Sequence, residues 1–357
     1  MTTSPNFGGQ ELRIVEEMAW FRQRGHHVWL AAAADSDIQK AARQKELPVI
    51  PIRIRGSINP LATARLLAAC RRLGVELLVA RGSRETACAW PVSLALRLPL
   101  VRYQHICHEL KEGFFQKLLW CRAADEIVAA SESIRRRLRD QNLAGEKSIH
   151  VLGEYVDRTM FHPRVSAGDL RARYGIPADA CLIINVGMFR PDKGQSLLVA
   201  AADEILRKHP QCWFMLVGSP TRTSSSNALL ESIRNSPQAG RFVLTGFQSE
   251  IAAHLAASDL VCLTSQYEAQ SKIIPQAFAM GKLVVAPNIG GIPELLHHER
   301  NGLLYDREKP GALAAAIDSA LNCDRAPLIA NALADAERLD IDRLMNDTEQ
   351  LYATLIK

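Results

Sequence analysis

Two cations follow a glycine turn in the segment 185–194, an arrangement suited to phosphate binding. An apolar run ends at Gly187, and Arg190 and Lys193 then stand three residues apart before a helical stretch. An arginine binds phosphate oxygens as a fork of donors, and a lysine binds them as a compact charge. At the carboxyl end of a parallel strand this pair is expected to bind a diphosphate. A solvated turn is the alternative interpretation.

A carboxylate, Glu268, follows a second apolar run, residues 260–265. Pro275 suits the first position of a helix, because its missing N–H costs nothing there. Gln276 is therefore predicted in the first helical turn, facing the same edge of the sheet as Glu268. Free N–H groups of residues 271–273 are then expected to meet phosphate oxygens.

Two further candidate sites, at His105 and at Gly9, have weaker support from the sequence. His105 ends the apolar run 100–104, and His108 and Glu109 follow it, but the order is not H-E-x-x-H and no third ligand position stands out. We therefore expect no metal, and a buried structural histidine is the alternative for His105. Gly9 closes a Gly-Gly turn before the helical stretch 11–21 and is a second candidate anion site. The turn lacks the full G-x-G-x-x-G, which disfavours a dinucleotide dehydrogenase.

Short apolar runs alternate with helical stretches almost throughout the 357 residues, a pattern typical of α/β domains with parallel sheets. The helical stretch 60–73 is expected to bury Leu61, Ala64, Leu67, Ala68 and Leu73. The predicted strands are residues 28–33, 49–54, 76–80, 100–104, 126–130 and 149–152, then 181–187, 212–218, 241–246, 260–265, 283–287 and 302–305.

These runs predict two doubly wound domains facing an interdomain cleft. The predicted division is residues 1–153, an irregular linker 154–177 containing Pro163 and Gly175, residues 178–325, and terminal helices 326–357. The terminal helices are expected to pack back on the first domain. Few residues precede the first glycine turn, so the first strand of that domain is predicted to be very short or truncated.

The segment 265–294 resembles the signature of glycosyltransferase family 4, the retaining GT-B enzymes also called glycosyl transferases group 1. In that signature two glutamates with seven residues between them precede an alanine-rich helix and a strand ending in Gly-Gly-x-Pro-Glu. The resemblance extends over nearly the whole chain, through the segments 8–11, 24–28, 102–105, 156–163, 186–194, 245–247 and 301–304.

The resemblance implies site residues. Glu268 and His105 hold the positions of the groups that approach the donor sugar and are the catalytic candidates. Gln276 replaces the glutamate that grips the nucleotide ribose, and Met188 replaces an arginine whose role Arg190 is expected to take. The donor-binding candidates are Gly9, Gly187, Arg190, Lys193, Gly218, Ser271, Lys272, Ile273 and Gln276.

The implied function is transfer of a sugar, with retention, from a nucleotide-diphosphate sugar to a hydroxyl acceptor, in cell-envelope glycan or lipopolysaccharide synthesis. The nucleotide sugar (UDP-, GDP- or ADP-linked) is a substrate, and neither cofactor nor metal is expected. A nucleotide-sugar epimerase of the same fold and a non-catalytic nucleotide-sugar binder remain alternatives. A nucleic-acid partner is disfavoured, because the basic residues are not interleaved with aromatic ones.

Charge and composition indicate where the protein works. Residues 1–153 hold 23 Lys and Arg against 15 Asp and Glu, including Arg135, Arg136, Arg137 and Arg139 in the stretch 131–141. Such a patch favours peripheral contact with an anionic membrane and a lipid-linked acceptor, with a solvated helix face as the alternative. With no apolar span or leader, we expect a cytoplasmic protein on the inner face of the membrane. The eight cysteines are interpreted as buried thiols.

Overall fold

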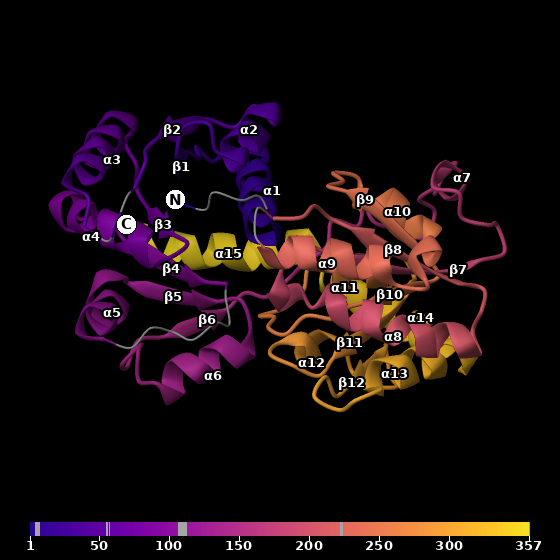
Figure 1. The fold of residues 1–357 in the computed structure, drawn as a ribbon. Coiled ribbons are helices and arrows are strands. Elements are labelled where there is room, and N and C mark those ends of the chain that lie inside the picture. Colours follow the sequence, from indigo (N-terminus) through magenta and orange to yellow (C-terminus); the bar gives the residue numbers. More distant parts are fainter. Residues whose placement is uncertain (4–7, 55, 57, 106–112, 222–223, 357) are drawn as a thin grey trace. The chain divides into compact units, whose positions relative to one another are not determined.

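The computed structural model describes residues 1–3, 8–54, 56, 58–105, 113–221 and 224–356. The chain forms two compact units, residues 1–153 with 344–357 and residues 154–343. Each is built on parallel strands with helices in the connections (Figure 1). The predicted fold class, α/β with two doubly wound parallel-sheet domains, is confirmed.

Among its described residues, the first unit has six parallel strands in two sheets. β1 pairs with β2, and the second sheet has the order β3-β4-β5-β6. The predicted runs all contain a strand, although most strands are shorter than predicted. The strands are β1 (Leu30–Ala32), β2 (Val49–Pro51), β3 (Leu78–Ala80), β4 (Leu100–Gln104), β5 (Glu126–Ala129) and β6 (Ile149–Val151).

Helices cover these sheets from both sides. One core joins α3 and α4 to β3 and β4, and another places Leu344, Leu351 and Leu355 of α15 against β4 and β5. The helices are α1 (Gly9–Gln23), α2 (Asp37–Gln44), α3 (Pro60–Leu73), α4 (Ser83–Leu96), α5 (Phe114–Leu118), a π turn (Leu119–Ala123), α6 (Glu132–Asp140) and the last part of α15 (Ile341–Leu355).

The first residues of the chain connect the two sheets of this unit. The Thr2 N–H donates to Ala31 O of β1 (3.2 Å), and the Met1 amine donates to Val79 O of β3 (2.8 Å). This short segment therefore lies where a doubly wound sheet has its first strand, although it forms no regular strand itself.

In the part of the second unit that the structure describes, six parallel strands form one sheet in the order β12-β11-β10-β7-β8-β9. This is the doubly wound order 3-2-1-4-5-6, and the order reverses between β7 and β10. Ligands of such sheets bind outside the carboxyl ends of the strands at that switch point. The strands are β7 (Cys181–Val186), β8 (Cys212–Val217), β9 (Phe242–Gly246), β10 (Leu260–Cys262), β11 (Leu283–Pro287) and β12 (Leu303–Tyr305).

Two apolar cores hold this sheet, one on each face. Leu182 and Ile184 of β7 join the core under α10, α11 and α14, whereas Ile183 joins the core under α8, α9 and α13. The alternation is the period of two expected of a strand buried on both faces. The helices are α7 (Leu170–Arg173), α8 (Gln195–Lys208), α9 (Ser224–Asn235), α10 (Ile251–Ala257), α11 (Ile273–Ala279), α12 (Ile292–Leu295), α13 (Ala312–Asn322), α14 (Ala326–Arg338) and two 3₁₀ turns (Pro191–Lys193, Ala239–Arg241).

The observed units divide the chain differently from the predicted domains at two places. Residues 154–177, predicted as a linker, lie in the second unit, where Phe161 and Leu170 join its core. The two terminal helices also separate. α14 packs in the second unit beside Gly281, and only the part of α15 from Leu344 belongs to the first unit.

The buried face of α3 was predicted wrongly. Leu61 is 62% exposed, and the residues that face the core are Ala62, Leu66, Ala69 and Cys70. Several apolar residues around this helix permit more than one stripe, and packing against α4 decides between them. The cysteines also differ from the interpretation as uniformly buried thiols. Cys323 is exposed and Cys121 and Cys181 are partly exposed, while Cys107 lies outside the described residues.

Candidate functional site

The candidate site of the second unit centres on the carboxylate of Glu268, in the loop after β10. Its Oε1 atom accepts hydrogen bonds from Lys193 Nζ (2.6 Å) and from Ser265 Oγ (2.8 Å). The side chain of Glu268 is 10% exposed and that of Lys193 is 23% exposed. Two predicted site residues that lie 75 positions apart are thus brought together. Both donors use the same oxygen, Oε1.

Glycines let the backbone approach Glu268 closely. Gly290 has φ +52°, and a Cβ there would lie 1.9 Å from Glu268 O. The next residue, Gly291, donates its N–H to the same carbonyl (3.2 Å). The Gly-Gly pair after β11 therefore holds the loop that carries Glu268, and no side chain is tolerated at Gly290.

A second close approach positions the loop after β7. Gly187 donates to Val217 O (2.9 Å), and a Cβ on Gly218 would lie 2.0 Å from Gly187 O. At the other end of the loop, Thr264 Oγ1 donates to Lys193 O (2.8 Å). Gly187, Gly218 and Lys193 are thus fixed at the carboxyl ends of β7, β8 and β10, the edge where such sheets bind ligands.

Two residues of this site were not singled out from the sequence. Gln195, 1% exposed at the start of α8, donates from Nε2 to Met188 O (3.1 Å) and supports the same loop. Ser265 orients Glu268, and its place directly after the predicted strand was the available signal. Arg190 donates to its neighbour Asp192 (2.8 Å), so part of its charge is already compensated. Its expected diphosphate role stays a prediction.

The helix after Glu268 begins earlier than predicted. α11 starts at Ile273, so Pro275 is its third residue rather than its first. The N–H of that position has no partner within a helix either, so proline remains compatible. Gln276 is 6% exposed and Ser271 is 9% exposed, while the Lys272 ammonium lies 4.0 Å from the centroid of the Tyr155 ring. The donor-binding roles expected of 271–273 and Gln276 stay predictions.

The other candidates lie in the first unit. Gly9 begins α1, with Glu11 accepting from the Gly8 N–H (2.9 Å), and a Cβ on Gly9 would meet nothing within 4 Å. His105 follows β4 and its Nε2 atom contacts Arg81 Nη1 (2.9 Å). Burial first, and then Arg81 and Arg13, hold the pKa of His105 well below its usual range.

No cluster suited to a metal ion occurs among the residues that the structure describes. His108 and Glu109, weighed as ligands beside His105, lie outside those residues. Within the same described part, no helix is long and apolar enough to cross a membrane.

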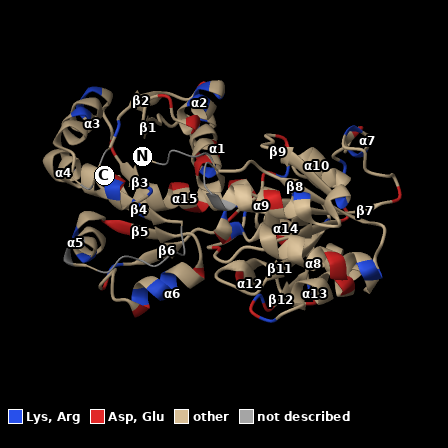
Figure 2. Cartoon of the chain, in the orientation of Figure 1, with Lys and Arg blue, Asp and Glu red and all other residues tan. Residues whose placement is uncertain are grey.

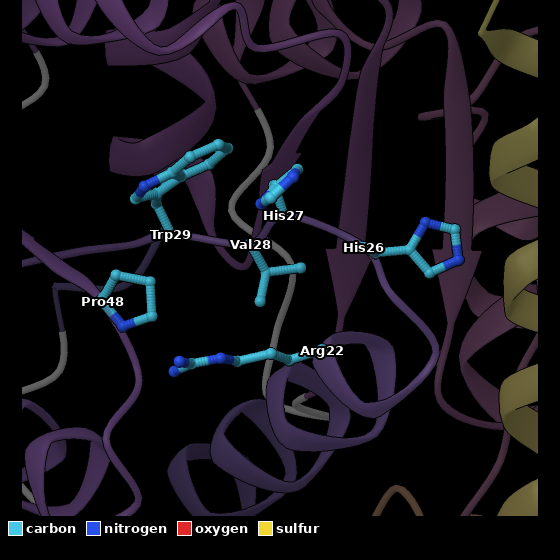
Figure 3. A pocket seen from close by; sticks show the side chains of 6 residues that line it. All are labelled: Arg22, His26, His27, Val28, Trp29 and Pro48. Carbon is cyan, nitrogen blue, oxygen red and sulfur yellow. The ribbon is translucent and has the colours of Figure 1, made fainter.

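Two hollows lie away from these residues. One, of about 140 Å³, is lined by His26, His27, Val28, Trp29 and Pro48, with Arg22 reaching from α1 toward Pro48 (Figure 3). The other, of about 560 Å³, lies beside β12 and α13. Neither includes Glu268, Lys193 or His105.

Two models of known protein families together match most of the chain. Residues 167–335 match the model described as Glycosyl transferases group 1, and residues 7–160 match the model described as Glycosyltransferase Family 4. The chain belongs to glycosyltransferase family 4. This family 4 chain is 30% identical over 246 residues to a D-inositol 3-phosphate glycosyltransferase of Nocardioides sp.. The alignment covers 64% of this chain and 54% of that relative, so it spans about half the relative's length.

Solved structures share the fold over the full chain. A glycosyltransferase from Rickettsia africae has a TM-score of 0.88 at 20% identity, covering 99% of this chain and 97% of its own. Anabaena HepE in complex with UDP and glucose has a TM-score of 0.86 at 23% identity, covering 99% and 98%. At these identities the likeness establishes the fold alone, and the fold of this family 4 chain is GT-B.

Proposed function

We propose that this family 4 glycosyltransferase transfers a sugar from a nucleoside-diphosphate sugar to a hydroxyl acceptor, with retention at the anomeric carbon. The observation that carries the proposal is the pair formed by Lys193 and Glu268 at the switch point of the second sheet. One member suits a diphosphate and the other suits sugar hydroxyls. The similarity to a D-inositol 3-phosphate glycosyltransferase and to a protein solved in complex with UDP-glucose supports the same substrate class.

The reaction breaks the bond between the anomeric carbon and the diphosphate oxygen, and forms a bond from that carbon to the acceptor oxygen. Lys193 and Arg190 stabilise the negative charge that develops on the departing diphosphate. Glu268 binds a sugar hydroxyl through Oε2, while Ser265 holds Oε1. The acceptor proton passes to an oxygen of the departing diphosphate, so the step needs no carboxylate nucleophile. The two-carboxylate scheme of glycosidases is not proposed, because Gln276 cannot serve as its second acid.

Gln276 is proposed to bind the ribose diol as a neutral amide. An amide lacks the charge assistance of a carboxylate, so the nucleotide is held less strongly. This substitution is also the observation that favours a second candidate, a nucleotide-sugar binder without transferase activity. Binding of a nucleotide sugar without turnover across a broad acceptor panel would support that candidate.

The decisive experiment has two steps. Thermal shift with UDP-, GDP- and ADP-sugars identifies the donor, because a ligand that binds the folded state raises apparent stability. Radiolabelled transfer with that donor then compares the unaltered protein with Glu268→Ala. Transfer to a hydroxyl acceptor that is lost in Glu268→Ala while the fold is retained supports the proposal. Release of an epimerised sugar without acceptor would instead identify an epimerase.

We further propose a cytoplasmic protein that contacts an anionic membrane peripherally through α6, with a lipid-linked or lipopolysaccharide-type acceptor in cell-envelope synthesis. Figure 2 shows basic residues along α6, all of them arginines, and Arg136 is 69% exposed although its Nε atom lies 4.0 Å from Glu132 Oε1. Other arginines of this helix are partly engaged, because Arg135 pairs with Glu132 and Arg139 donates to Gly145 O and Lys147 O. The electrostatic contribution per exposed cation is about 1 kcal/mol or less.

Co-sedimentation with liposomes tests the membrane proposal. Binding to anionic vesicles at low salt, weakened by high salt and by Arg136→Ala, is expected because the attraction is screened within a Debye length. Equal partitioning onto neutral and anionic vesicles, or no binding at low salt, would contradict it.

A further inference from the structure

A compact group of cationic and aromatic side chains surrounds His105 in the first unit. Arg81 comes directly after β3, and its Nη1 atom lies 2.9 Å from His105 Nε2. The Arg81 guanidinium also lies over the ring of Tyr103, 3.8 Å from its centroid. The imidazole of His105 stacks beside that ring at 5.5 Å, with 10° between the planes. The three side chains therefore form one packed group at the carboxyl ends of β3 and β4.

The Arg81 contact determines the protonation of His105. A guanidinium has only N–H donors and stays protonated in proteins, so it cannot accept a hydrogen bond. His105 Nε2 must therefore accept with its lone pair, which requires a neutral imidazole. The single ring proton is then on Nδ1. Burial, Arg81 and Arg13 also lower the pKa of His105, and a lowered pKa likewise favours the neutral imidazole.

Arg81 is itself held by a buried carboxylate. Glu17 on α1 accepts one hydrogen bond from Arg81 Nη2 and another from Arg13 Nε (2.7 Å), and the side chains of Arg81 and Glu17 are each 5% exposed. Burial alone would raise the pKa of Glu17, but Arg81 and Arg13 outweigh it and hold that pKa below its usual range. Moving Arg81 away would leave a buried charge with fewer partners, which is costly.

The remaining neighbours fix the aromatic platform. Arg13 also donates to Gly153 O (2.9 Å) at the end of β6. The hydroxyl of Tyr103 meets that of Tyr352 (2.9 Å) on α15, so the C-terminal helix anchors the ring on which Arg81 and His105 lie. Burial raises the pKa of both tyrosines, which therefore stay neutral near neutral pH.

We propose that Arg81 is a positioning residue that keeps His105 in its neutral Nδ1–H tautomer, so that His105 meets the substrate as a hydrogen-bond donor. The partner of that donor is an oxygen of the sugar or its leaving group, and this part rests on the proposed transferase function. With Nε2 occupied by Arg81, His105 does not act as a general base through that atom. Sequence reasoning identified His105 alone, because Arg81 belongs to a different strand end.

Nitrogen NMR of the ¹⁵N-histidine-labelled full chain tests the tautomer directly. The His105 resonances are assigned by their loss in His105→Gln. We expect a protonated Nδ1 and an unprotonated Nε2 that do not titrate between pH 8 and pH 6. An imidazole that titrates near its ordinary pKa of about 6.5, or one with the proton on Nε2, would overturn the proposal.

Variants then test the dependence on Arg81. Arg81→Met is expected to raise the pKa of His105 and to free Nε2 for a proton, although burial and Arg13 still lower that pKa. Arg81→Lys is expected to preserve the neutral state. Arg84→Met removes an exposed arginine nearby and serves as the matched control. If Arg81→Met fails to fold, the double change Arg81→Met and Glu17→Gln neutralises the buried carboxylate that has lost Arg81 and keeps only Arg13 as a partner. A His105 spectrum that is unchanged in the folded Met variants would refute the role of Arg81.

The pH profile of transfer provides the functional readout. With an ordinary pKa, only about a quarter of His105 would be neutral at pH 6. We therefore expect kcat/KM of Arg81→Met to fall more than that of the unaltered protein between pH 8 and pH 6, by up to about fourfold, because burial and Arg13 still lower the pKa of His105 in the variant. If the two pH profiles were equal, His105 would not act as a hydrogen-bond donor to the substrate, even if its tautomer is as proposed. If the unaltered protein bound no nucleotide sugar, the transferase function would be refuted instead. The NMR result on the tautomer would stand independently.

Discussion

Replacing Glu268 with glutamine should strengthen binding of a nucleoside diphosphate while it impairs sugar transfer. Lys193 Nζ is bonded to Glu268 Oε1 at 2.6 Å, so the ammonium that is proposed to meet the diphosphate already has an anionic partner. A diphosphate must share or displace that partner, and it also meets the negative charge of the carboxylate. Glutamine keeps the shape and can still accept from Ser265, but it removes the competing charge.

The magnitude follows from the geometry of the pair. A hydrogen bond to a charged group contributes roughly 1.5–3 kcal/mol. Lys193 Nζ has three donors and the Lys193 side chain is 23% exposed, so it can keep one bond to Glu268 while it meets phosphate oxygens. We therefore use less than the lower limit, about 1 kcal/mol, which corresponds to roughly fivefold tighter binding of the free diphosphate.

Isothermal titration calorimetry with UDP, GDP and ADP measures this effect. Lys193→Ala should weaken the diphosphate that binds, by roughly 1.5–3 kcal/mol. Glu299→Gln, an exposed glutamate of the same unit, is the matched control and should leave the affinity unchanged. Diphosphate affinity of Glu268→Gln that equals or falls below that of the unaltered protein would refute the competition between carboxylate and phosphate for Lys193.

Three other changes test separate parts of the structure. Gln276→Glu should tighten donor binding if the ribose contact persists, and a severe loss in calorimetry would mean that the site is built around an amide. Gly218→Ala should lower the free energy of unfolding, measured by urea titration, by at least about 2 kcal/mol, because a Cβ would lie 2.0 Å from Gly187 O. Gly9→Ala should leave it unchanged, because a Cβ there would meet nothing within 4 Å. Asp335→Asn should lower the melting temperature more at pH 7 than at pH 3. Although burial opposes it, the bonded arginine and asparagine lower the pKa of Asp335, so its stabilising contribution exists above its unfolded value of about 3.9 and is lost as pH falls.

The sequence alone was sufficient for the α/β architecture and for the position of several candidate residues along it. Every predicted strand run contains a strand, because short β-rich apolar segments between helical ones have few alternatives in a doubly wound sheet. Glu268, Lys193 and Gly187 were predicted to follow the carboxyl ends of strands, where such sheets bind ligands, and they lie there in the structure. Their roles in binding and catalysis stay predictions. Strand positions and the residues that follow them depend on the amino-acid pattern of each segment, which is local.

Only the tertiary structure decided which of these side chains contact one another and which neighbouring residues position them. Ser265 and Lys193 converge on one oxygen of Glu268 because β7 and β10 are neighbours in the sheet, and strand order is not encoded in either segment by itself. Arg81 and His105 follow different strands, and Glu17 reaches them from α1. The protonation of His105 therefore depends on contacts between segments far apart in sequence, which hydrophobic periodicity along one segment does not specify.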